Sequence, residues 1–493
     1  MGCGLGGTSL INANVCLSPD ILVLEDQRWP TAVRTDHYLN AGFARARDML
    51  APETLPESST PLKLKALEKA AASFGRQAER VPLHIAFTDK VNRAGVRQAA
   101  CTECGDCMAG CNVGAKTTVH STYLADASQH GAQCFTGMRV RYVERAGETW
   151  RISFIMEGQE DRVVPVRAVS APVVVIAAGT YGSNEIMMRS RDRGLAVSDR
   201  LGQTISTNAD AIAFGYNNDT PVGAVGIGHP PKQGVAKPGP AVTGLIDLRR
   251  RKDPNDRIAL VEASVQSPMA RLLPLMLPLG AVIGTDTDKG LHDLIGELKR
   301  TGESLIAGAY TGAVHNTAVF LAVGRDSASG RMVLDGEHLS IAWPDALKEP
   351  VFERIEATIK KAVAATGGTY VPNPVSKAFL GGNLFTVHPL GGCGMGDDAG
   401  QGVVDHRCRV FDTAPGRARD AVHDGLYVCD ASVLPCPIGI HPLLTITAVA
   451  ERAMLLFARD RGMPLDVSPR TDLAVEPPAA PAAQKRRSWF GRS

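Results

Sequence analysis

The sequence predicts an α/β protein built from two structural units, and three observations support this prediction. At 493 residues the chain exceeds the usual size of a single domain. Residues 171–192, APVVVIAAGTYGSNEIMMRSRD, place a short apolar run before glycines and a helical pattern, as in a parallel strand followed by a turn and a helix. Residues 211–375 instead contain alternating apolar and polar segments, which are typical of antiparallel strands.

The individual elements follow from local patterns. In the first unit, residues 133–156 predict two strands around the turn at 146–148. Residues 173–176 predict a buried strand, and Gly179 and Gly182 a turn before a helix that begins near Ser183. The second unit contains three predicted strands and two predicted helices, namely strands at 239–249, 257–265 and 315–324 and helices near 286–308 and 350–366.

Composition excludes several classes of protein. A formal net charge of +2 does not indicate the strongly basic character of proteins that bind nucleic acid. No apolar run reaches the roughly 20 residues of a transmembrane helix; residues 272–284, LLPLMLPLGAVIG, predict a buried or lid-like segment, with contact to a membrane or a lipid-like substrate as the alternative. Eleven cysteines, an odd number, predict reduced thiols in a cytoplasmic compartment.

Two histidines lie next to elements that could hold a ligand. His388 lies in NLFTVHPLGGCGMGDD, between a predicted strand and a turn whose glycines would let the backbone approach a ligand. His441 directly precedes a predicted helix that starts at Pro442, and the free N–H groups of such a helix favour negative charge. Asp430 ends the predicted strand in GLYVCDASVLP, where it would either bind ligand hydroxyl groups or cap a turn.

Four segments together resemble the glucose-methanol-choline (GMC) flavoprotein oxidoreductases, particularly their cholesterol-oxidase-like bacterial branch. The segments are MGCGLGGTSLINANV, AAGTYGSNEIMMRSR, TVHPLGGCGMGDD and GLYVCDASVLPCPIGIHPLLTITAVAER. The resemblance runs from the first residue to about residue 461. It implies a Rossmann-like FAD-binding domain made of discontinuous segments, with an inserted α+β substrate domain that contains an antiparallel sheet.

On this resemblance the chain divides into four parts. Residues 1–210 form the first part of the FAD-binding domain, residues 211–375 the substrate-binding domain, residues 376–465 the second part of the FAD-binding domain, and residues 466–493 a disordered tail. The resemblance also implies a set of FAD contacts along the flavin, the adenine, the ADP portion and the ribityl chain. These residues are Gly6, Thr8, Ser9, Asn12, Val15, Val140, Ala178, Gly179, Asp430, Ala431, Pro442 and Leu443.

The implied reaction is oxidation of the CH–OH group of an alcohol by hydride transfer to flavin N5. His388 matches the family's catalytic base and His441 its second active-site position, where sterol oxidases commonly have asparagine. The predicted substrate is a sterol-like or other bulky apolar alcohol, with O₂ or a redox partner as electron acceptor. The alternatives are a sugar or aliphatic alcohol dehydrogenase that reduces a quinone or cytochrome, and an inactive or partner-dependent subunit.

The cysteine-rich loop 101–111 adds a second hypothesis. Cys101, Cys104, Cys107 and Cys111 have the CxxCxxCxxxC spacing of bacterial ferredoxins, although Asn112 replaces the usual proline. The loop would hold a [4Fe–4S] cluster, a zinc ion or no metal, in which case the four side chains are reduced thiols.

Two further expectations concern the start of the chain and the substrate domain. Family members begin with a strand, a GxGxxG turn and a helix; GLGGTSL is the only glycine-rich candidate near the start, and no strand precedes it. We therefore expect an amino-terminal truncation and weak FAD binding. Glu262, in IALVEASV, is a candidate polar group of the substrate pocket, but its alternating strand favours a surface position.

Overall fold

The computed structural model describes residues 2, 4–158, 166–287, 291–373 and 385–465. The tail predicted at 466–493 therefore lies outside the described residues. The described α-helices are α1 (Ile21–Leu24), α2 (Thr31–Thr35), α3 (Tyr38–Leu50), α4 (Leu62–Ser73), α5 (Tyr123–Gln129), α6 (Gly179–Arg191), α7 (Leu273–Ala281), α8 (Leu291–Ala307), α9 (Gly312–His315), α10 (Pro350–Ala364) and α11 (Leu443–Asp460). Short 3₁₀ helices are η1 (Gly7–Leu10), η2 (Cys107–Ala109), η3 (Pro254–Asp256), η4 (Ser267–Met269), η5 (Ala346–Lys348) and η6 (Ala431–Val433).

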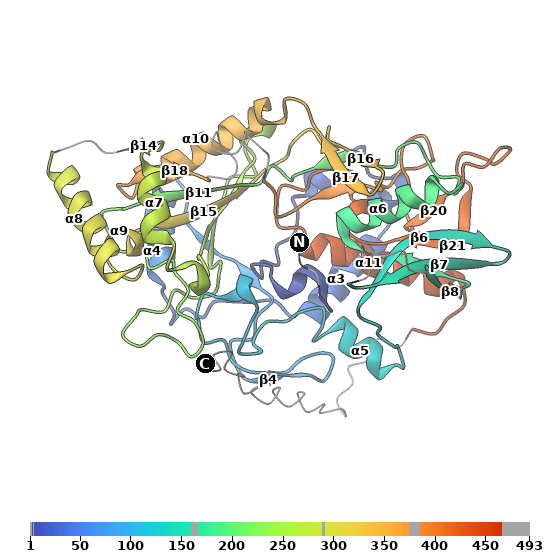
Figure 1. Ribbon diagram of the computed structural model, residues 1–493, viewed down its shortest axis with the longest axis horizontal. Coiled ribbons are helices and arrows are strands. Elements are labelled where there is room, and N and C mark those ends of the chain that lie inside the picture. Colours follow the sequence, from blue (N-terminus) through green and yellow to red (C-terminus); the bar gives the residue numbers. More distant parts are fainter. Residues whose placement is uncertain (1, 3, 159–165, 288–290, 374–384, 466–493) are drawn as a thin grey trace, which may run out of the picture.

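A seven-stranded antiparallel sheet organises one half of the molecule, on the left of Figure 1. Its strands, in spatial order, are β14 (Thr285–Asp286), β18 (Thr369–Pro372), β11 (Ala211–Tyr216), β15 (Ala318–Val323), β13 (Ala259–Ala263), β12 (Gly244–Asp247) and β2 (Glu79–Arg80). The register pairs Ala213 with Phe320 and Val261 with Leu321. The antiparallel sheet predicted for the inserted segment is confirmed, and β2 joins it from the first 210 residues.

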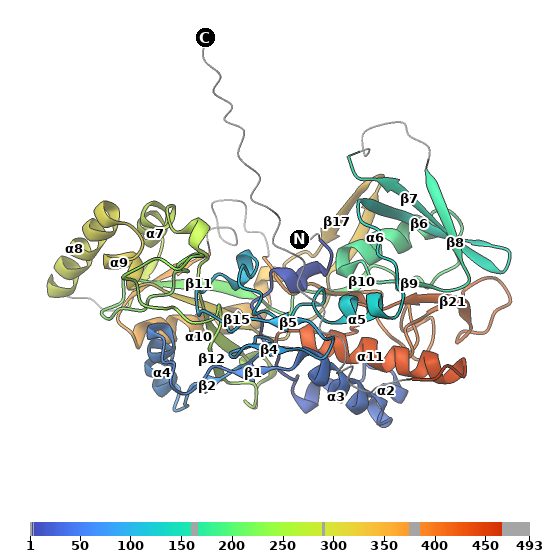
Figure 2. The ribbon, with the colours of Figure 1, turned by 90° about the horizontal axis from the view of Figure 1, so that it is seen from below.

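Helices cover this sheet and explain why its central strands are buried. Every residue of β13 and β15 is buried, because α4 and α10 pack beneath the sheet while α7 packs against β18 on the other side (Figure 2). α10 confirms the amphipathic helix predicted at 350–366, and α8 lies within the helical region predicted at 286–308.

Helix α7 corresponds to the uncharged run at 272–284. Leu273 and Leu277 are buried in a small cluster with Val314 and Val371, whereas Leu275 and Leu279 are exposed. The segment is therefore only half buried, because one face of α7 packs on the protein and the other faces outward. Within the described ranges, no helix combines the length and apolar character that crossing a bilayer requires.

The other half of the molecule contains the predicted strand, turn and helix. β9 (Val174–Ile176) pairs in parallel with β21 (Val422–Val428), which also pairs with β20 (Arg409–Phe411). The helix after β9 begins at Gly179 rather than near Ser183, so Gly182 lies inside α6. Val175 is exposed, contrary to the predicted buried strand. β9 is the edge strand of this three-stranded sheet.

The remaining strands form small antiparallel sheets. The hairpin predicted around 146–148 is confirmed as β6 (Met138–Ala146) and β7 (Thr149–Met156). The other pairings are β7 with β8 (Arg167–Ala171), β1 (Glu53–Thr54) with β3 (Pro82–Leu83), β4 (Lys90–Val91) with β5 (Arg97–Gln98), β10 (Gln203–Ser206) with β19 (Leu390–Gly392), and β16 (Arg331–Asp335) with β17 (His338–Ala342).

Helix α11 is packed tightly against α3. A Cβ at Gly42 of α3 would lie 2.2 Å from the carbonyl oxygen of Ala448, so the close crossing of these helices requires glycine there. Arg452 of α11 is buried and paired with Asp36 at 2.5 Å. Pro442 is the N-cap of α11 and not its first helical residue. These contacts fix the helix whose amino end follows His441.

Glu262 is buried, which contradicts the expected surface position. Its Oε2 pairs with Lys63 Nζ of α4 at 2.6 Å, and its Oε1 accepts hydrogen bonds from the backbone N–H groups of Thr243 and Gly244. Both side chains are at most 3% exposed. The alternating pattern was misleading because α4 covers the sheet face that would otherwise be solvated.

Replacing Lys63 with methionine is expected to lower the free energy of unfolding by about 3 kcal/mol, because Glu262 would remain buried without its countercharge. Chemical denaturation of the purified chain measures this change. The double variant Lys63→Met, Glu262→Gln is the matched control: its amide oxygen still accepts from Thr243 and Gly244, so much of the lost stability should return. A single variant as stable as the parent chain would contradict the prediction.

Candidate active site

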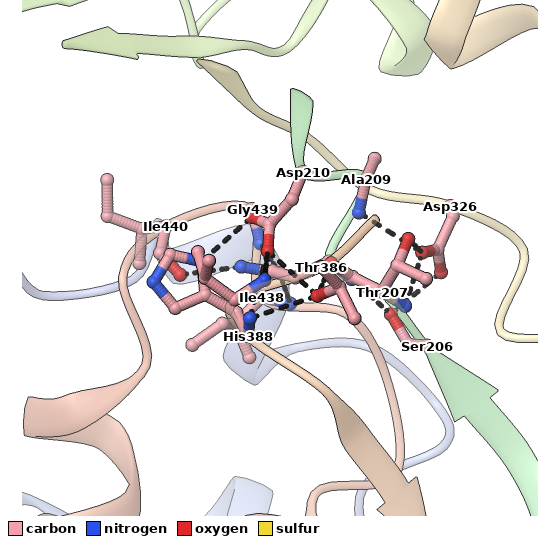
Figure 3. Close-up of polar contacts among 12 residues, drawn as sticks. Ser206, Thr207, Ala209, Asp210, Asp326, Thr386, His388, Ile438, Gly439 and Ile440 are labelled. Atoms are coloured by element: carbon pink, nitrogen blue, oxygen red, sulfur yellow. Dashed lines mark hydrogen bonds and ion pairs between the residues drawn. The ribbon is translucent and has the colours of Figure 1, made fainter. Parts of the chain in front are cut away.

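His388 is held by a single carboxylate that the sequence analysis did not identify. The Oδ1 atom of Asp210 lies 2.8 Å from His388 Nδ1. The Oδ2 atom accepts hydrogen bonds from the backbone N–H groups of Val387 and His388 at 2.8 and 2.9 Å, and from Thr386 Oγ1 at 2.8 Å. Asp210 thus fixes both the backbone and the ring of His388 (Figure 3).

Asp210 is itself positioned by the turn between β10 and β11. Asp326 organises this turn, since its carboxylate accepts hydrogen bonds from Ser206 Oγ at 2.7 Å and from the backbone N–H groups of Thr207 and Ala209 at 2.8 and 3.1 Å. Burial raises the pKa of Asp326, although these donors oppose the shift. Figure 3 shows Asp326 on one side of this turn and Asp210 with His388 on the other.

His388 does not have the predicted surroundings along the chain. Residues 383 and 384 of the strand predicted before His388 lie outside the described residues, and the described residues 385–389 are irregular. The strand β19 follows the histidine. The neighbouring glycines approach protein atoms: a Cβ at Gly391 would lie 2.1 Å from Thr204 O, and one at Gly392 would lie 2.2 Å from Asn184 Nδ2. These two glycines therefore allow the chain to pack closely against itself.

His441 lies beside His388 although 53 residues separate them in the sequence. The two ring centroids are 5.1 Å apart and the rings are inclined by 77°. His441 is 4% exposed. Burial, with the nearby charges of His388 and Arg249, holds its pKa well below the usual 6.5. His441 is therefore a neutral imidazole near pH 7.

A second buried polar residue fixes the loop that leads into His441. Asn208 Oδ1 accepts hydrogen bonds from the N–H groups of Ile438 and Gly439 at 3.0 and 2.8 Å, and Asn208 Nδ2 donates to Ile440 O at 2.8 Å. Asn208 and Asp210 therefore hold the two histidines from one short turn. This shared support explains how two distant segments keep a constant separation.

Buried polar atoms beside the histidine pair lack partners among the residues that the structure describes. They are Nδ1 and Nε2 of His441 and the hydroxyl oxygen of Thr445, which lies in the first turn of α11. Buried polar groups are normally hydrogen-bonded. The amino end of α11 also has no side-chain cap, so its leading N–H groups are available. These donors and acceptors fit a polar ring system bound against the start of the helix.

The sequence-predicted cofactor residues fall into three groups in the structure. Pro442 and Leu443 form the start of α11. Asp430 lies against the start of α6, where its Oδ2 accepts hydrogen bonds from Gly179 N at 2.9 Å and from Ser183 Oγ. Its Oδ1 accepts from Ser432 N and caps η6. Ala178, Gly179 and Ala431 belong to this second group, and β6, which carries Val140, packs on α6.

The third group is the amino-terminal loop. Ser9 Oγ donates to Gly6 O at 2.6 Å and accepts from Val119 N at 2.9 Å. Lys116 Nζ donates to Asn12 O at 2.8 Å. Thr8 lies in η1, and Val15 forms an isolated bridge with Leu83. The loop is thus tied to residues 116–119, and the hydroxyl of Ser9 is already engaged by the protein.

The four cysteines of the 101–111 loop line one pocket together with Lys116. In the described part of the chain, no group of three or more histidine, cysteine or acidic side chains is arranged to hold a metal ion. The ferredoxin-like spacing is therefore not accompanied by ligand geometry for an iron–sulfur cluster or zinc. Burial instead raises the pKa of the Cys101 thiol to about 12.

Comparison with known proteins identifies the family of this chain. Profiles of the family described as GMC oxidoreductase match residues 1–206 and 354–450, which together exceed half of the chain. The chain therefore belongs to the GMC oxidoreductase family, whose members are FAD flavoproteins. The match leaves out most of the seven-stranded sheet.

Individual relatives are distant. A cholesterol oxidase of Mycobacterium tuberculosis is 27% identical, with 92% of this chain and 78% of the relative covered. A long-chain-alcohol oxidase of Arabidopsis thaliana is 22% identical over 91% of this chain and 57% of the relative. The solved structure of an FAD-dependent oxidoreductase from Chaetomium thermophilum has a TM-score of 0.53 at 13% identity, covering 93% and 86% of the two chains. This structural likeness supports the α/β fold.

Proposed function

We propose that this chain oxidises the CH–OH group of an alcohol, with FAD as the group that accepts the hydride. The observation that carries the proposal is the histidine pair: a ring anchored by Asp210 lies 5.1 Å from a second, neutral ring whose nitrogens have no described protein partner. Such a pair can hold one hydroxyl group between a proton acceptor and a hydrogen-bonding neighbour.

His388 is the proposed base. A carboxylate only accepts hydrogen bonds, so Asp210 places the proton of the neutral imidazole on Nδ1 and leaves the lone pair on Nε2. That nitrogen can take the hydroxyl proton as the carbon loses its hydride. His441 orients the same hydroxyl group through a second hydrogen bond. Its burial excludes water from the site.

The start of α11 is the proposed seat of the flavin ring. Bound FAD supplies a ring that accepts a hydride at N5 and gains negative charge. Leu443 N and the other leading N–H groups of the helix favour that charge. Asp430, Ala431, Ala178, Gly179 and Val140 are the proposed contacts of the remaining cofactor, and Gly6, Thr8, Ser9, Asn12 and Val15 those of the loop along it. Ser9 would contact it through its backbone because its hydroxyl is engaged.

The proposed substrate is a bulky apolar alcohol. The relatives named above are a cholesterol oxidase and a long-chain-alcohol oxidase, and both names denote apolar alcohols. The proposed substrate domain at 211–375 contributes six strands of the seven-stranded sheet, and β2 comes from the first 210 residues. The proposed FAD-binding segments at 1–210 and 376–465 carry the two histidines, Asp210 and Asn208.

Anaerobic mixing of the FAD-supplemented chain with a panel of alcohols tests the proposal. Cholesterol, a long-chain primary alcohol and glucose are compared, and bleaching of the flavin absorbance reports hydride transfer. We expect bleaching by one of the apolar alcohols, and subsequent addition of O₂ or a quinone identifies the acceptor. Bound FAD that no alcohol reduces would overturn the proposed reaction. Failure to bind FAD would favour a partner-dependent subunit.

Replacing His441 with asparagine is expected to lower turnover about tenfold, the effect of one weakened hydrogen bond in the transition state. The pH at which turnover is half-maximal should stay the same, because a neutral amide replaces an imidazole whose pKa is held well below 6.5 by burial. Turnover measured between pH 5 and 9 tests both statements. A displaced midpoint would show that His441 titrates during catalysis.

A further inference from the structure

A small pocket lies behind the loop that carries His441. Its wall includes three arginines from three different segments, Arg249, Arg257 and Arg325, together with Asp20. Leu22 and Val23 of α1 and the chain at Ile438 and Gly439 complete the lining. The proposed functions of the histidine pair leave this pocket without a role.

We call this pocket the Arg pocket. The charges of its three guanidinium groups are not equally neutralised by carboxylates. Arg249 is paired with Asp247 through Nε and Nη2 at 3.0 and 2.7 Å, and Arg325 is paired with Asp26 through Nη2 at 2.5 Å. Arg257 hydrogen-bonds to the backbone carbonyls of Arg251 and Lys252 at 2.9 and 3.5 Å, which carry no charge. The positive charge of Arg257 is therefore left without a carboxylate in these contacts.

One donor in the Arg pocket is unused in the described part of the chain. Arg325 Nε is buried and has no partner among the described residues, and buried donors are normally hydrogen-bonded. Asp20 contributes a negative charge, but its Oδ1 caps α1 by accepting from Leu22 N at 3.0 Å. Arg250 and Lys252, which are exposed beside Arg249, add positive charge outside the pocket.

We propose that the Arg pocket binds a phosphate group, either free or as the monoester of a small molecule. Several guanidinium groups from separate segments can donate to different oxygens of one oxyanion, and their planar N–H pairs match the spacing of phosphate oxygens. Leu22, Val23 and Ile438 give the pocket an apolar side that suits a short organic group on a monoester. This site is separate from the proposed alcohol and FAD sites and does not depend on them.

A bound phosphate would act on the loop before His441. Gly439 has a positive φ of 63°, and a Cβ there would lie 3.1 Å from Arg325 Cγ, so the loop rests directly on this arginine. The same loop is held on its other side by Asn208. Phosphate held by Arg325 would therefore fix the loop from both sides.

Titration calorimetry with inorganic phosphate, at constant ionic strength and on the full chain, tests the site. Arg257→Gln removes the positive charge and the paired N–H donors of the guanidinium group, and should weaken phosphate binding at least about tenfold. Arg354→Gln is the matched control, since Arg354 is 54% exposed, does not line the pocket, and pairs with Asp256 through Nε and Oδ1 at 3.6 Å. The phosphate affinity of this variant should equal that of the parent chain. Thermal unfolding of each variant verifies folding.

Three results would overturn the proposal. The first is no saturable phosphate binding by the parent chain. The second is an Arg257→Gln variant, folded as judged by its thermal transition, that binds phosphate as tightly as the parent. The third is loss of phosphate binding when FAD is added in excess, since the Arg pocket would then be part of the cofactor site. Binding that survives FAD and is lost in Arg257→Gln supports it.

Discussion

Replacing His388 with alanine is expected to lower the turnover of alcohol about 10²- to 10⁴-fold, the usual contribution of a positioned general base. The reason is the geometry around its ring: Asp210 leaves Nε2 as the proton acceptor, and His441 is the neighbouring ring. Steady-state and single-turnover rates with the best substrate of the panel measure the loss. The thermal transition should fall modestly, because the ring is only 13% exposed and its loss leaves Asp210 Oδ1 without its partner. The chain should still fold, because the backbone hydrogen bonds of Val387 and His388 to Asp210 Oδ2 remain.

Two controls separate loss of the base from loss of structure. His338→Ala is a matched variant, because His338 is exposed on the β16 and β17 hairpin and should turn over at the parent rate. Added imidazole should partly restore the rate of His388→Ala by occupying the space left by the ring. A His388→Ala variant with the parent turnover would remove this histidine from the mechanism.

Strong periodic patterns in the sequence predict much of the fold. The hairpin β6 and β7 and the helices α10 and α11 are found close to their predicted ranges, because each has a regular apolar spacing that local burial determines. Boundaries are less well predicted. Gly179 was predicted to lie in the turn before the helix, but it is the first residue of α6, with a positive φ of 76°.

Burial that depends on distant segments is not predicted by local patterns. Glu262 lies on an alternating strand, yet Lys63, from a helix 199 residues earlier, covers and pairs with it. Val175 has the sequence of a buried strand but is exposed at a sheet edge. The burial of Glu262 depends on a helix from another part of the chain, and the exposure of Val175 likewise does not follow from the residues around it in the sequence.

The candidate site shows the same division. The motifs around His388 and His441 identify both histidines, but the sequence gives no spacing from which their 5.1 Å separation follows. Asp210 and Asn208 were missed because a polar turn such as STNAD is ordinary in a loop. One signal was available: both residues lie at the end of the predicted segment 1–210, directly before the residues that form β11.

Replacing Asp210 with asparagine is expected to lower turnover about 10²- to 10⁴-fold, although the substitution is nearly isosteric. Three donors, Val387 N, His388 N and Thr386 Oγ1, surround the Oδ2 position, so the amide oxygen must take that place. The amide NH₂ group then faces His388 Nδ1 and donates to it. The ring proton moves to Nε2, and the nitrogen that should accept the hydroxyl proton no longer can.

The double variant Asp210→Asn, His388→Ala distinguishes this positioning role from a general structural one. Because Asp210 acts through the ring of His388, its substitution should cost nothing further once that ring is gone, and the double variant should turn over at the rate of His388→Ala. Asp424→Asn, at a side chain that is 88% exposed, controls for loss of a surface carboxylate. Independent, multiplicative losses in the double variant would mean that Asp210 supports the fold or the substrate in another way.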